Sequence, residues 1–320
     1  MVRVRADDDA DRPLSSTLAT ATDDALPTTT ALAAGARLGR YVVTAPIGVG
    51  GMGAVYAAHD PELDRHVAIK VLRGDVSEHA TLRLRREART MAQLSHANLV
   101  AVHDVGVVDD RLFLTMELIE GTTLRVWCRD RPWREVLAAY LAAGRGLAAA
   151  HAAGVVHRDF KPDNVLRSHR GRVAVGDFGI ARRRDHATAI DGAPIATLDL
   201  ALTQTGAVLG TPSYMAPEQL DGSSADARSD QFAFAVALWE GLHRQHPLVA
   251  PGAGLPALRL AAAAGRVIEP PPGPVPTRVT RALTRALRPD PAARWPSLDA
   301  LLAELDVLSR ARSSCGPRWR

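Results

Sequence analysis

Residues 157–164 read His-Arg-Asp-Phe-Lys-Pro-Asp-Asn, and the organisation of the chain is clearest around them. They follow an Ala- and Leu-rich segment, residues 136–153, whose spacing predicts a long helix ending at Gly154. An Asp five residues before an Asn, on a loop after a helix, can place a proton-accepting carboxylate beside a metal-binding amide. Asp159 and Asn164 are therefore the first candidate functional residues.

Two further motifs follow this loop. Asp177-Phe178-Gly179 begins thirteen residues beyond Asn164, and its carboxylate can chelate a magnesium ion that bridges phosphates. Ala216-Pro217-Glu218 closes the segment that Asp177 opens. Each motif alone is a weak signal, but their order and spacing indicate phosphoryl chemistry.

A glycine-rich run, Gly-Val-Gly-Gly-Met-Gly-Ala-Val, occupies residues 48–55. Glycines let a backbone turn tightly and approach phosphates closely. Dinucleotide-binding folds use the same G-x-G-x-x-G string, but there it opens a helix, whereas here residues 54–58 resume a strand pattern. A strand–loop–strand flap over phosphates fits better, and an ordinary glycine-rich hairpin is the remaining alternative.

Lysine is rare in this chain. Of 39 basic residues, all are arginine except Lys70 and Lys161. Lys70 ends the strand-like run Val-Ala-Ile-Lys, and Glu87, seventeen residues on in a helical stretch, can hold its ammonium against nucleotide phosphates. Because arginine does not replace a compact charge on a flexible stem, the two lysines mark positions with a specific task.

Short strand-like runs dominate the first third of the chain and helices the rest. The predicted strands are 41–47, 54–59, 67–72, 99–107 and 112–116, with short ones around 165 and at 172–175. The predicted helices are 80–94, 136–153, 230–242, 277–288 and 297–308, and a Pro-rich loop spans 269–276. A small β-rich lobe joined to a larger helical lobe is the coarse prediction.

The composition of the 320 residues, 47% hydrophobic and 23% charged, is that of a globular protein. There is no apolar run long enough for a membrane span and no apolar core of a signal peptide near the N-terminus. Two cysteines are too few for a disulfide framework. A net charge of +4 is too mild to favour nucleic acid. We therefore expect a cytoplasmic protein with neither nucleic-acid nor membrane partners.

Together these motifs resemble those of the eukaryotic-type protein kinase domain of bacterial serine/threonine kinases, over residues 37–308. The resemblance implies an α+β bilobal protein-kinase fold. Its small antiparallel β-rich N-lobe with one helix would span 37–118, and its larger, mainly helical C-lobe 121–308. We expect a disordered Asp/Thr/Ala-rich tail at 1–36 and an Arg-rich tail at 309–320. The implied activity is ATP-dependent transfer of the γ-phosphoryl group to Ser or Thr hydroxyls of protein substrates.

The resemblance also implies an ATP site. Lys70, positioned by Glu87, would hold the α- and β-phosphates, and backbone groups of Glu117 and Leu118 would bond the purine. The remaining residues implied for ATP are the phosphate-covering Gly48, Gly50 and Gly53, the adenine-flanking Val55, Ala68 and Leu166, Met116 behind the adenine, and Ile47.

The implied catalytic residues are Asp159, which accepts the proton of the attacking hydroxyl, and Lys161, which neutralises the γ-phosphoryl group, together with Lys70 and Glu87. Asn164 and Asp177 would bind Mg²⁺, with Mn²⁺ as the alternative ion. Three residues are implied to hold the helical lobe together: the ion-paired Glu218 and Arg294, and Asp230, which braces the catalytic loop.

Residue choice points to Ser or Thr as the acceptor, because Lys161 and Thr211 match serine/threonine kinases. Thr203 and Thr205 lie in the long segment between Asp177 and Glu218, and we expect their autophosphorylation, in trans within a transient homodimer. Phosphate there would pair with Arg158 and Arg182.

Two other functions remain open at this level. A catalytically inactive nucleotide-binding scaffold (a pseudokinase) would lack part of the catalytic set, which is complete here. A small-molecule kinase of related fold would lack the Ala-Pro-Glu motif and the threonine-bearing segment, which are both present.

Overall fold

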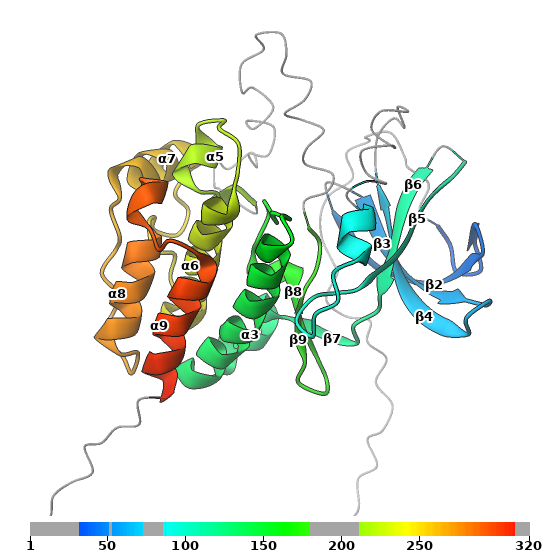
Figure 1. Cartoon of the computed structure of the whole chain (residues 1–320), viewed down its shortest axis with the longest axis horizontal. Helices are drawn as coiled ribbons and strands as arrows, with labels where there is room; N and C mark the ends of the chain where they lie inside the picture. Colours follow the sequence, from blue (N-terminus) through cyan, green and yellow to red (C-terminus); the bar gives the residue numbers. More distant parts are fainter. Residues whose placement is uncertain are drawn as a thin grey trace, which may run out of the picture.

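The computed structural model describes residues 32–50, 53–72, 86, 88–109, 111–178 and 211–310. Within these ranges the chain forms a β-sheet lobe and a helical lobe that lie side by side (Figure 1). Residues 118–120 join them, between β6 (Arg111–Glu117) and β7 (Gly121–Thr123). The predicted α+β bilobal arrangement is confirmed.

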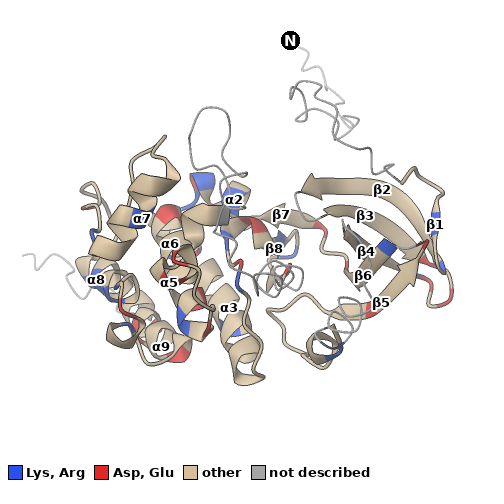
Figure 2. Ribbon diagram, turned by 90° about the horizontal axis from the view of Figure 1, so that it is seen from above, with Lys and Arg blue, Asp and Glu red and all other residues tan. Residues whose placement is uncertain are grey.

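The first lobe is a six-stranded antiparallel sheet in the order β1-β2-β3-β4-β6-β5, seen from above in Figure 2. Its core packs around Tyr41, Ile69 and Phe113, each at most 4% exposed. The strands besides β6 are β1 (Arg37–Leu38), β2 (Tyr41–Gly50), β3 (Gly53–Asp60), β4 (Arg65–Leu72) and β5 (Val102–Val108).

The glycine-rich run continues the sheet instead of ending it. β2 extends three residues beyond the predicted strand, and Gly50 pairs with Gly53 of β3. Register shifts after Val43 and Pro46 bend this hairpin. A Cβ at Gly53, whose φ is +154°, would lie 2.0 Å from the carbonyl oxygen of Val71, so only glycine fits there.

Residues 32–36, which we expected to belong to the disordered tail, are hydrogen-bonded to the sheet. The backbone N–H of Gly35 donates to Val43 O at 2.8 Å, and that of Leu32 donates to the Tyr56 hydroxyl at 3.1 Å. Residues 32–36 therefore pack against the sheet because its edge supplies them with hydrogen-bond partners. Residues 1–31 lie outside the described ranges, as do 311–320 of the expected Arg-rich tail.

The helix predicted over 80–94 is described at residues 86 and 88–94; residues 86 and 88–92 are helical, and the helix ends two residues earlier than predicted. Ala88 and Met91 are buried there, 2% and 4% exposed. The loop that follows this helix, at residues 96–100, is bonded to the helical lobe. Leu99 forms a parallel bridge with Val175, and the N–H of Val100 donates to Val175 O at 2.9 Å.

The second lobe is helical around a large apolar core. Residues 229–239 of α6 are all buried, so this helix runs through the centre of the lobe with apolar residues all round it. α3, α8 and α9 pack around it (Figure 1). The helices are α2 (Leu124–Trp127), α3 (Trp133–Ala152), α5 (Pro217–Leu220), α6 (Ala227–His243), α7 (Leu255–Ala264), α8 (Thr277–Ala286) and α9 (Leu298–Arg310).

Several helices differ from the sequence-based expectation: α3 and α6 begin early, and α2, α5 and α7 were not predicted. α6 begins at Ala227, three residues early, because the Asp226 carboxylate caps it by accepting the N–H groups of Arg228 and Ser229. α7 was not predicted at all. Its buried residues Leu255, Leu258 and Ala262 are few for a ten-residue helix, so the periodic signal is weak.

A small sheet, in the order β7-β8-β9, lies beside α3 at the boundary of the lobes (Figure 1). β8 spans Val165–Ser168 and β9 spans Val173–Val175. The loop at residues 157–164 therefore lies between α3 and the start of β8, and Asp177 lies two residues after the end of β9.

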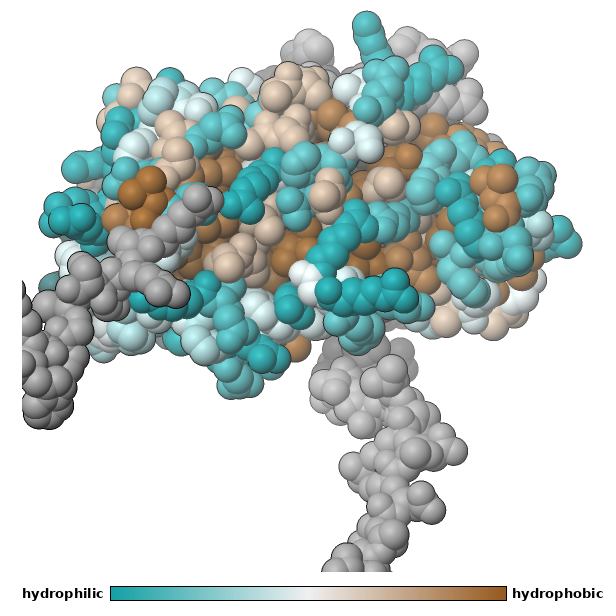
Figure 3. Space-filling view, turned by 60° about the horizontal axis from the view of Figure 1, so that its bottom comes forward, coloured by the Kyte–Doolittle hydropathy of each residue, from teal (hydrophilic) through white to brown (hydrophobic). Residues whose placement is uncertain are grey.

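No helix within the described ranges is long and apolar enough to span a membrane. On the face shown in Figure 3, hydrophobic residues are interspersed with hydrophilic ones.

Candidate active site

The start of the loop at residues 157–164 is held by hydrogen bonds to Asp230 of α6. The Asp230 carboxylate, 1% exposed, accepts the backbone N–H groups of His157 at 2.7 Å and Arg158 at 2.8 Å. His151 Nε2 of α3 donates to the same carboxylate at 2.8 Å. Arg158 has a φ of +64°, a left-handed conformation that costs a non-glycine residue energy. The bonds to Asp230 stabilise this turn.

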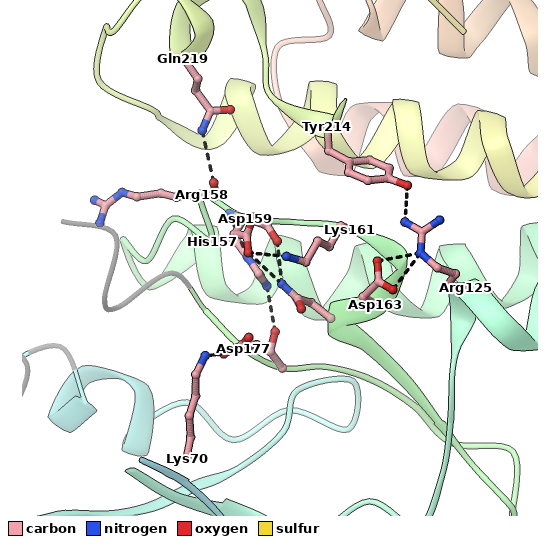
Figure 4. A network of polar contacts seen from close by, with 12 residues as sticks. Lys70, Arg125, His157, Arg158, Asp159, Lys161, Asp163, Asp177, Tyr214 and Gln219 are labelled. Carbon is pink, nitrogen blue, oxygen red and sulfur yellow. Dashed lines mark hydrogen bonds and ion pairs between the residues drawn. The ribbon is translucent and has the colours of Figure 1, made fainter. Parts of the chain in front are cut away.

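Asp159, Lys161 and Asn164 of this loop are joined by hydrogen bonds, and Figure 4 shows the contact between Asp159 and Lys161. Lys161 Nζ donates to Asp159 Oδ2 at 2.9 Å, and Asn164 Nδ2 donates to Asp159 O at 2.8 Å and to Asp159 Oδ2 at 3.3 Å. Asp159 and Asn164 are both 7% exposed. One carboxylate oxygen of Asp159 is thus oriented by two side chains of its own loop.

Asp177, two residues after β9, contacts the other lobe. Its φ is +55°, and its Oδ1 contacts Lys70 Nζ of β4 (Figure 4). The Lys70 side chain is 11% exposed, whereas that of Asp177 is 41% exposed. The lysine of one lobe and the carboxylate of the other therefore meet at the boundary between them.

Aromatic packing holds the residues on either side of Asp177. Phe178 is buried against the His157 ring at a centroid distance of 4.5 Å, and His157 Nε2 donates to Gly176 O at 2.9 Å. His157 in turn packs edge-on against Phe160, which contacts Phe234 of α6. The residues next to Asp177 are thus packed, through His157 and Phe160, against Phe234 at the centre of the helical lobe.

The residues implied for ATP lie on the strands that face the lobe boundary. Val55 of β3 pairs with Lys70, and Ala68 of β4 pairs with Met116 of β6. Leu166 lies on β8, and Leu118 follows β6. Ala68 is buried, Val55, Met116, Leu118 and Leu166 are half-buried, and Gly48, Gly50 and Ile47 are exposed on the hairpin.

The structure limits which backbone group of Glu117 can bond a purine. The N–H of Glu117 donates to Ala101 O at 2.9 Å, so a backbone bond from Glu117 to a purine could come only from its carbonyl. The Glu117 side chain is paired with Arg172, which sequence reasoning did not single out.

Glu218 and Arg294 form a buried ion pair. Arg294 Nη2 and Nη1 donate to Glu218 Oε2 at 2.7 Å and Oε1 at 2.8 Å, and Ser229 Oγ donates to Oε1 at 2.7 Å. The Arg294 side chain is fully buried and that of Glu218 is 16% exposed. Burial alone would raise the pKa of Glu218, but the hydrogen bonds from Arg294 and Ser229 outweigh it and hold this pKa below its ordinary value.

A second polar network was missed by the sequence analysis. Arg125 Nε of α2 lies 2.8 Å from both carboxylate oxygens of Asp163, and its Nη2 contacts the Tyr214 hydroxyl (Figure 4). Tyr214 donates to Glu240 Oε2 of α6 at 2.5 Å. Asp163 lies within residues 157–164, but the other three residues belong to no motif, and only their spatial proximity reveals the network.

Several implied residues fall outside the described ranges: Glu87, Thr203, Thr205 and Arg182. The side chain of Thr211 is also outside them.

A sheet lobe that carries a buried lysine, facing a helical lobe that carries an Asp–Lys–Asn cluster and a second carboxylate, defines a two-lobed phosphoryl-transfer domain. Residues 41–301 match the sequence profile of the protein kinase domain, and the chain belongs to that family. Use of ATP, a divalent metal ion and protein substrates is typical of this family.

Individual relatives agree with this family. The chain is 38% identical over 276 residues to serine/threonine-protein kinase PknL of Mycobacterium tuberculosis, covering 84% of this chain and 66% of PknL. It is 37% identical over 290 residues to a probable serine/threonine-protein kinase of Corynebacterium efficiens, covering 85% of this chain and 41% of that protein. The chain thus spans between about two fifths and two thirds of the length of these relatives.

Solved structures show the same fold. The crystal structure of the Mycobacterium tuberculosis PknI kinase domain matches with a TM-score of 0.63 at 27% identity, covering 87% of this chain and 99% of that chain.

Proposed function

We propose that this protein is a serine/threonine protein kinase that transfers the γ-phosphoryl group of ATP to Ser or Thr hydroxyls of proteins. The observation that carries the proposal is the cluster of Asp159, Lys161 and Asn164 on one braced loop, opposite the contact between Asp177 and Lys70. The complete set argues against a catalytically inactive scaffold. The names of the relatives support Ser or Thr as the acceptor.

The residues present suit a hard divalent cation. Asn164 uses its amide nitrogen to bond Asp159, which leaves the amide oxygen for a metal ion. The half-exposed carboxylate of Asp177 supplies further oxygen ligands, the kind that Mg²⁺ prefers. We propose Mg²⁺, with Mn²⁺ as the alternative, held by Asn164 and Asp177. The ion would neutralise phosphate charge when bound.

The chain's own residues would perform the rest of the reaction. Asp159 Oδ2 would accept the proton of the attacking hydroxyl, since the loop fixes its position and Lys161 lies 2.9 Å away. The Lys161 ammonium would stabilise the negative charge of the transferred group, and Lys70 would hold the nucleotide phosphates. Catalysis would thus rest on positioning and electrostatics.

We further propose activation by autophosphorylation of Thr203 and Thr205, in trans within a transient homodimer. Arg158 supports this. Its carbonyl accepts from Gln219 Nε2 at 3.3 Å, while its side chain extends away from Asp159 (Figure 4). An arginine directed away from the catalytic carboxylate can pair with a phosphate on the segment that precedes residue 211. The cytoplasmic location expected from the sequence stays a prediction.

Matched peptides test the acceptor class. Three peptides that differ only in Ser, Thr or Tyr at one position are incubated with the protein, ATP and Mg²⁺. We expect phosphate on the Ser and Thr peptides, and loss of transfer after chelation with EDTA. Transfer to the Tyr peptide alone, or transfer that is indifferent to EDTA, would contradict the proposal.

A further inference from the structure

Arg172 connects its own turn with two other segments, the loop at 96–100 and the end of β6. All three lie near residues 118–120, which join the lobes. Arg172 lies just before β9, and its backbone is fixed by a turn in which Ser168 N donates to Arg172 O at 2.8 Å. Its Nε donates to Ala97 O at 2.7 Å, and its Nη2 donates to Leu99 O at 2.8 Å. The same guanidinium donates to both carboxylate oxygens of Glu117, from Nη2 to Oε2 at 3.1 Å and from Nη1 to Oε1. One side chain of the helical lobe thus binds the last residue of β6 and the loop at 96–100.

The loop at 96–100 is itself immobilised against the helical lobe. Asn98 Nδ2 donates to Val173 O at 2.7 Å, and Val175 N donates to Asn98 O at 2.9 Å. A Cβ at Gly146 of α3 would lie 2.2 Å from Asn98 O, so α3 and the loop are in close backbone contact. Arg172 therefore attaches Glu117 to a rigid part of the molecule.

Glu117 lies where the strand meets the purine site. Met116, the residue before it, pairs with Ala68, and successive side chains of a strand point to opposite faces. The Glu117 carboxylate is therefore held on the face opposite that of Met116, while its N–H is bonded to Ala101 O. With side chain and N–H both fixed, the carbonyl of Glu117 has a defined direction.

We propose that Arg172 is a positioning residue for the nucleotide: its two-pronged bond to Glu117 sets the backbone of residues 117–118 that binds the purine. This rests on the proposed function, because it assumes a purine nucleotide between the lobes. The planar fork matters, since a lysine cannot bond both carboxylate oxygens and the two loop carbonyls in this geometry. Arg172 does not touch the cluster at Asp159, so it acts on nucleotide affinity and not on the transfer step.

Direct binding of Mg·ADP, without turnover, is the test. Arg172→Lys and Arg172→Ala are compared with wild type and with Arg170→Ala, an exposed arginine two residues away. We expect the Kd for ADP and the KM for ATP to rise about tenfold in both Arg172 variants, which corresponds to about 1.4 kcal/mol. We expect kcat to stay within about twofold, and Arg170→Ala to match wild type.

Inorganic tripolyphosphate separates positioning from a general loss of structure. As a competitor of ATP it carries phosphates and no purine, so its inhibition constant should be unchanged in the Arg172 variants. Equal weakening of ADP and tripolyphosphate, or an unchanged Kd for ADP, would overturn the proposal. If Arg172→Ala unfolds, Glu117→Gln removes the charge pair from the other side and should weaken ADP in the same direction.

The outcome also separates this inference from the proposed function. Wild-type protein that binds ADP but transfers no phosphate would contradict the kinase activity and leave the effect of Arg172 measurable. Wild-type protein that binds no ADP would overturn both.

Discussion

The Asp230 carboxylate accepts the backbone N–H groups of both His157 and Arg158, from a position on the central helix of the helical lobe. Each oxygen is used, because Oδ1 binds Arg158 N and Oδ2 binds His157 N and His151 Nε2. The loop that carries Asp159 is therefore held by a helix whose residues 229–239 are all buried. The position of the Asp159 carboxylate, which we propose is catalytic, is set by the core of the lobe.

Replacing Asp230 should disturb both stability and catalysis. In Asp230→Asn the amide NH₂ would face N–H donors, so buried donors lose an acceptor. We expect a loss of about 3 kcal/mol in the free energy of unfolding and a kcat about 100-fold lower. Asp226→Asn is the control, because asparagine caps a helix as well as aspartate does. Urea unfolding and peptide phosphorylation measure the two effects. An Asp230 variant with wild-type kcat would contradict this role.

Lys70 should matter for transfer far more than for folding. Lys70→Met removes the charge that contacts Asp177 but keeps a flexible side chain of similar length. Because Asp177 is half exposed, we expect a stability change within about 1 kcal/mol. We expect kcat/KM to fall by at least about 100-fold, since the charge that we propose holds the nucleotide phosphates is lost. Thermal unfolding and initial rates decide this, and a variant with near-normal rates would exclude Lys70 from the phosphate site.

The pair of Glu218 and Arg294 predicts a pH dependence of stability. Removing one partner of so buried a pair should cost about 3–5 kcal/mol at pH 7. The folded-state pKa of Glu218 lies below its ordinary value of 4.5, so the unfolded chain takes up a proton first as the pH falls. The stabilisation is complete above about pH 4.5 and declines as the pH falls toward the folded-state pKa.

The difference in unfolding free energy between wild type and Glu218→Gln measures this contribution. We expect the difference to be constant from pH 7 to 5 and to shrink below pH 4.5. A difference that grows as the pH falls would contradict the assignment.

Tyr214 should stabilise the segment at 211–214 through its hydroxyl. Tyr214→Phe removes the tyrosine donor from the Glu240 carboxylate and the hydroxyl acceptor from Arg125 Nη2, and we expect a loss of about 1–3 kcal/mol. Burial, together with the nearby Glu240 carboxylate, raises the pKa of Tyr214 far above its ordinary 10.0. The hydroxyl therefore stays protonated, and the difference between wild type and Tyr214→Phe should be equal at pH 7 and pH 9. A smaller difference at pH 9 would show that the hydroxyl titrates there.

The motif residues could be predicted from the sequence because each sits at a fixed spacing within a short segment. Asp159 and Asn164 share one loop, and the rarity of lysine singled out Lys70 and Lys161. Arg172 could not be found in this way, because its partners are 55 to 75 residues away in the chain.

The predictions of where helices and strands begin and end were wrong for local reasons. The capping carboxylate of Asp226 extends α6 beyond its apolar run, and α7 has too few buried residues to produce a clear period. The glycines of β2 continue a strand by backbone pairing alone, so no side-chain pattern reports it. Sequence patterns report buried side chains well, and capping and backbone pairing poorly.

The central claim is that Asp159 enables transfer of phosphate to Ser or Thr. Its most direct test is mass-spectrometric mapping of phosphate on the wild-type protein and on Asp159→Asn, each incubated with Mg²⁺ and ATP. We expect new phosphate on Thr203 or Thr205 of the wild type and none on the variant. Equal phosphate on both proteins, or none on a wild type that binds ATP, would contradict the claim.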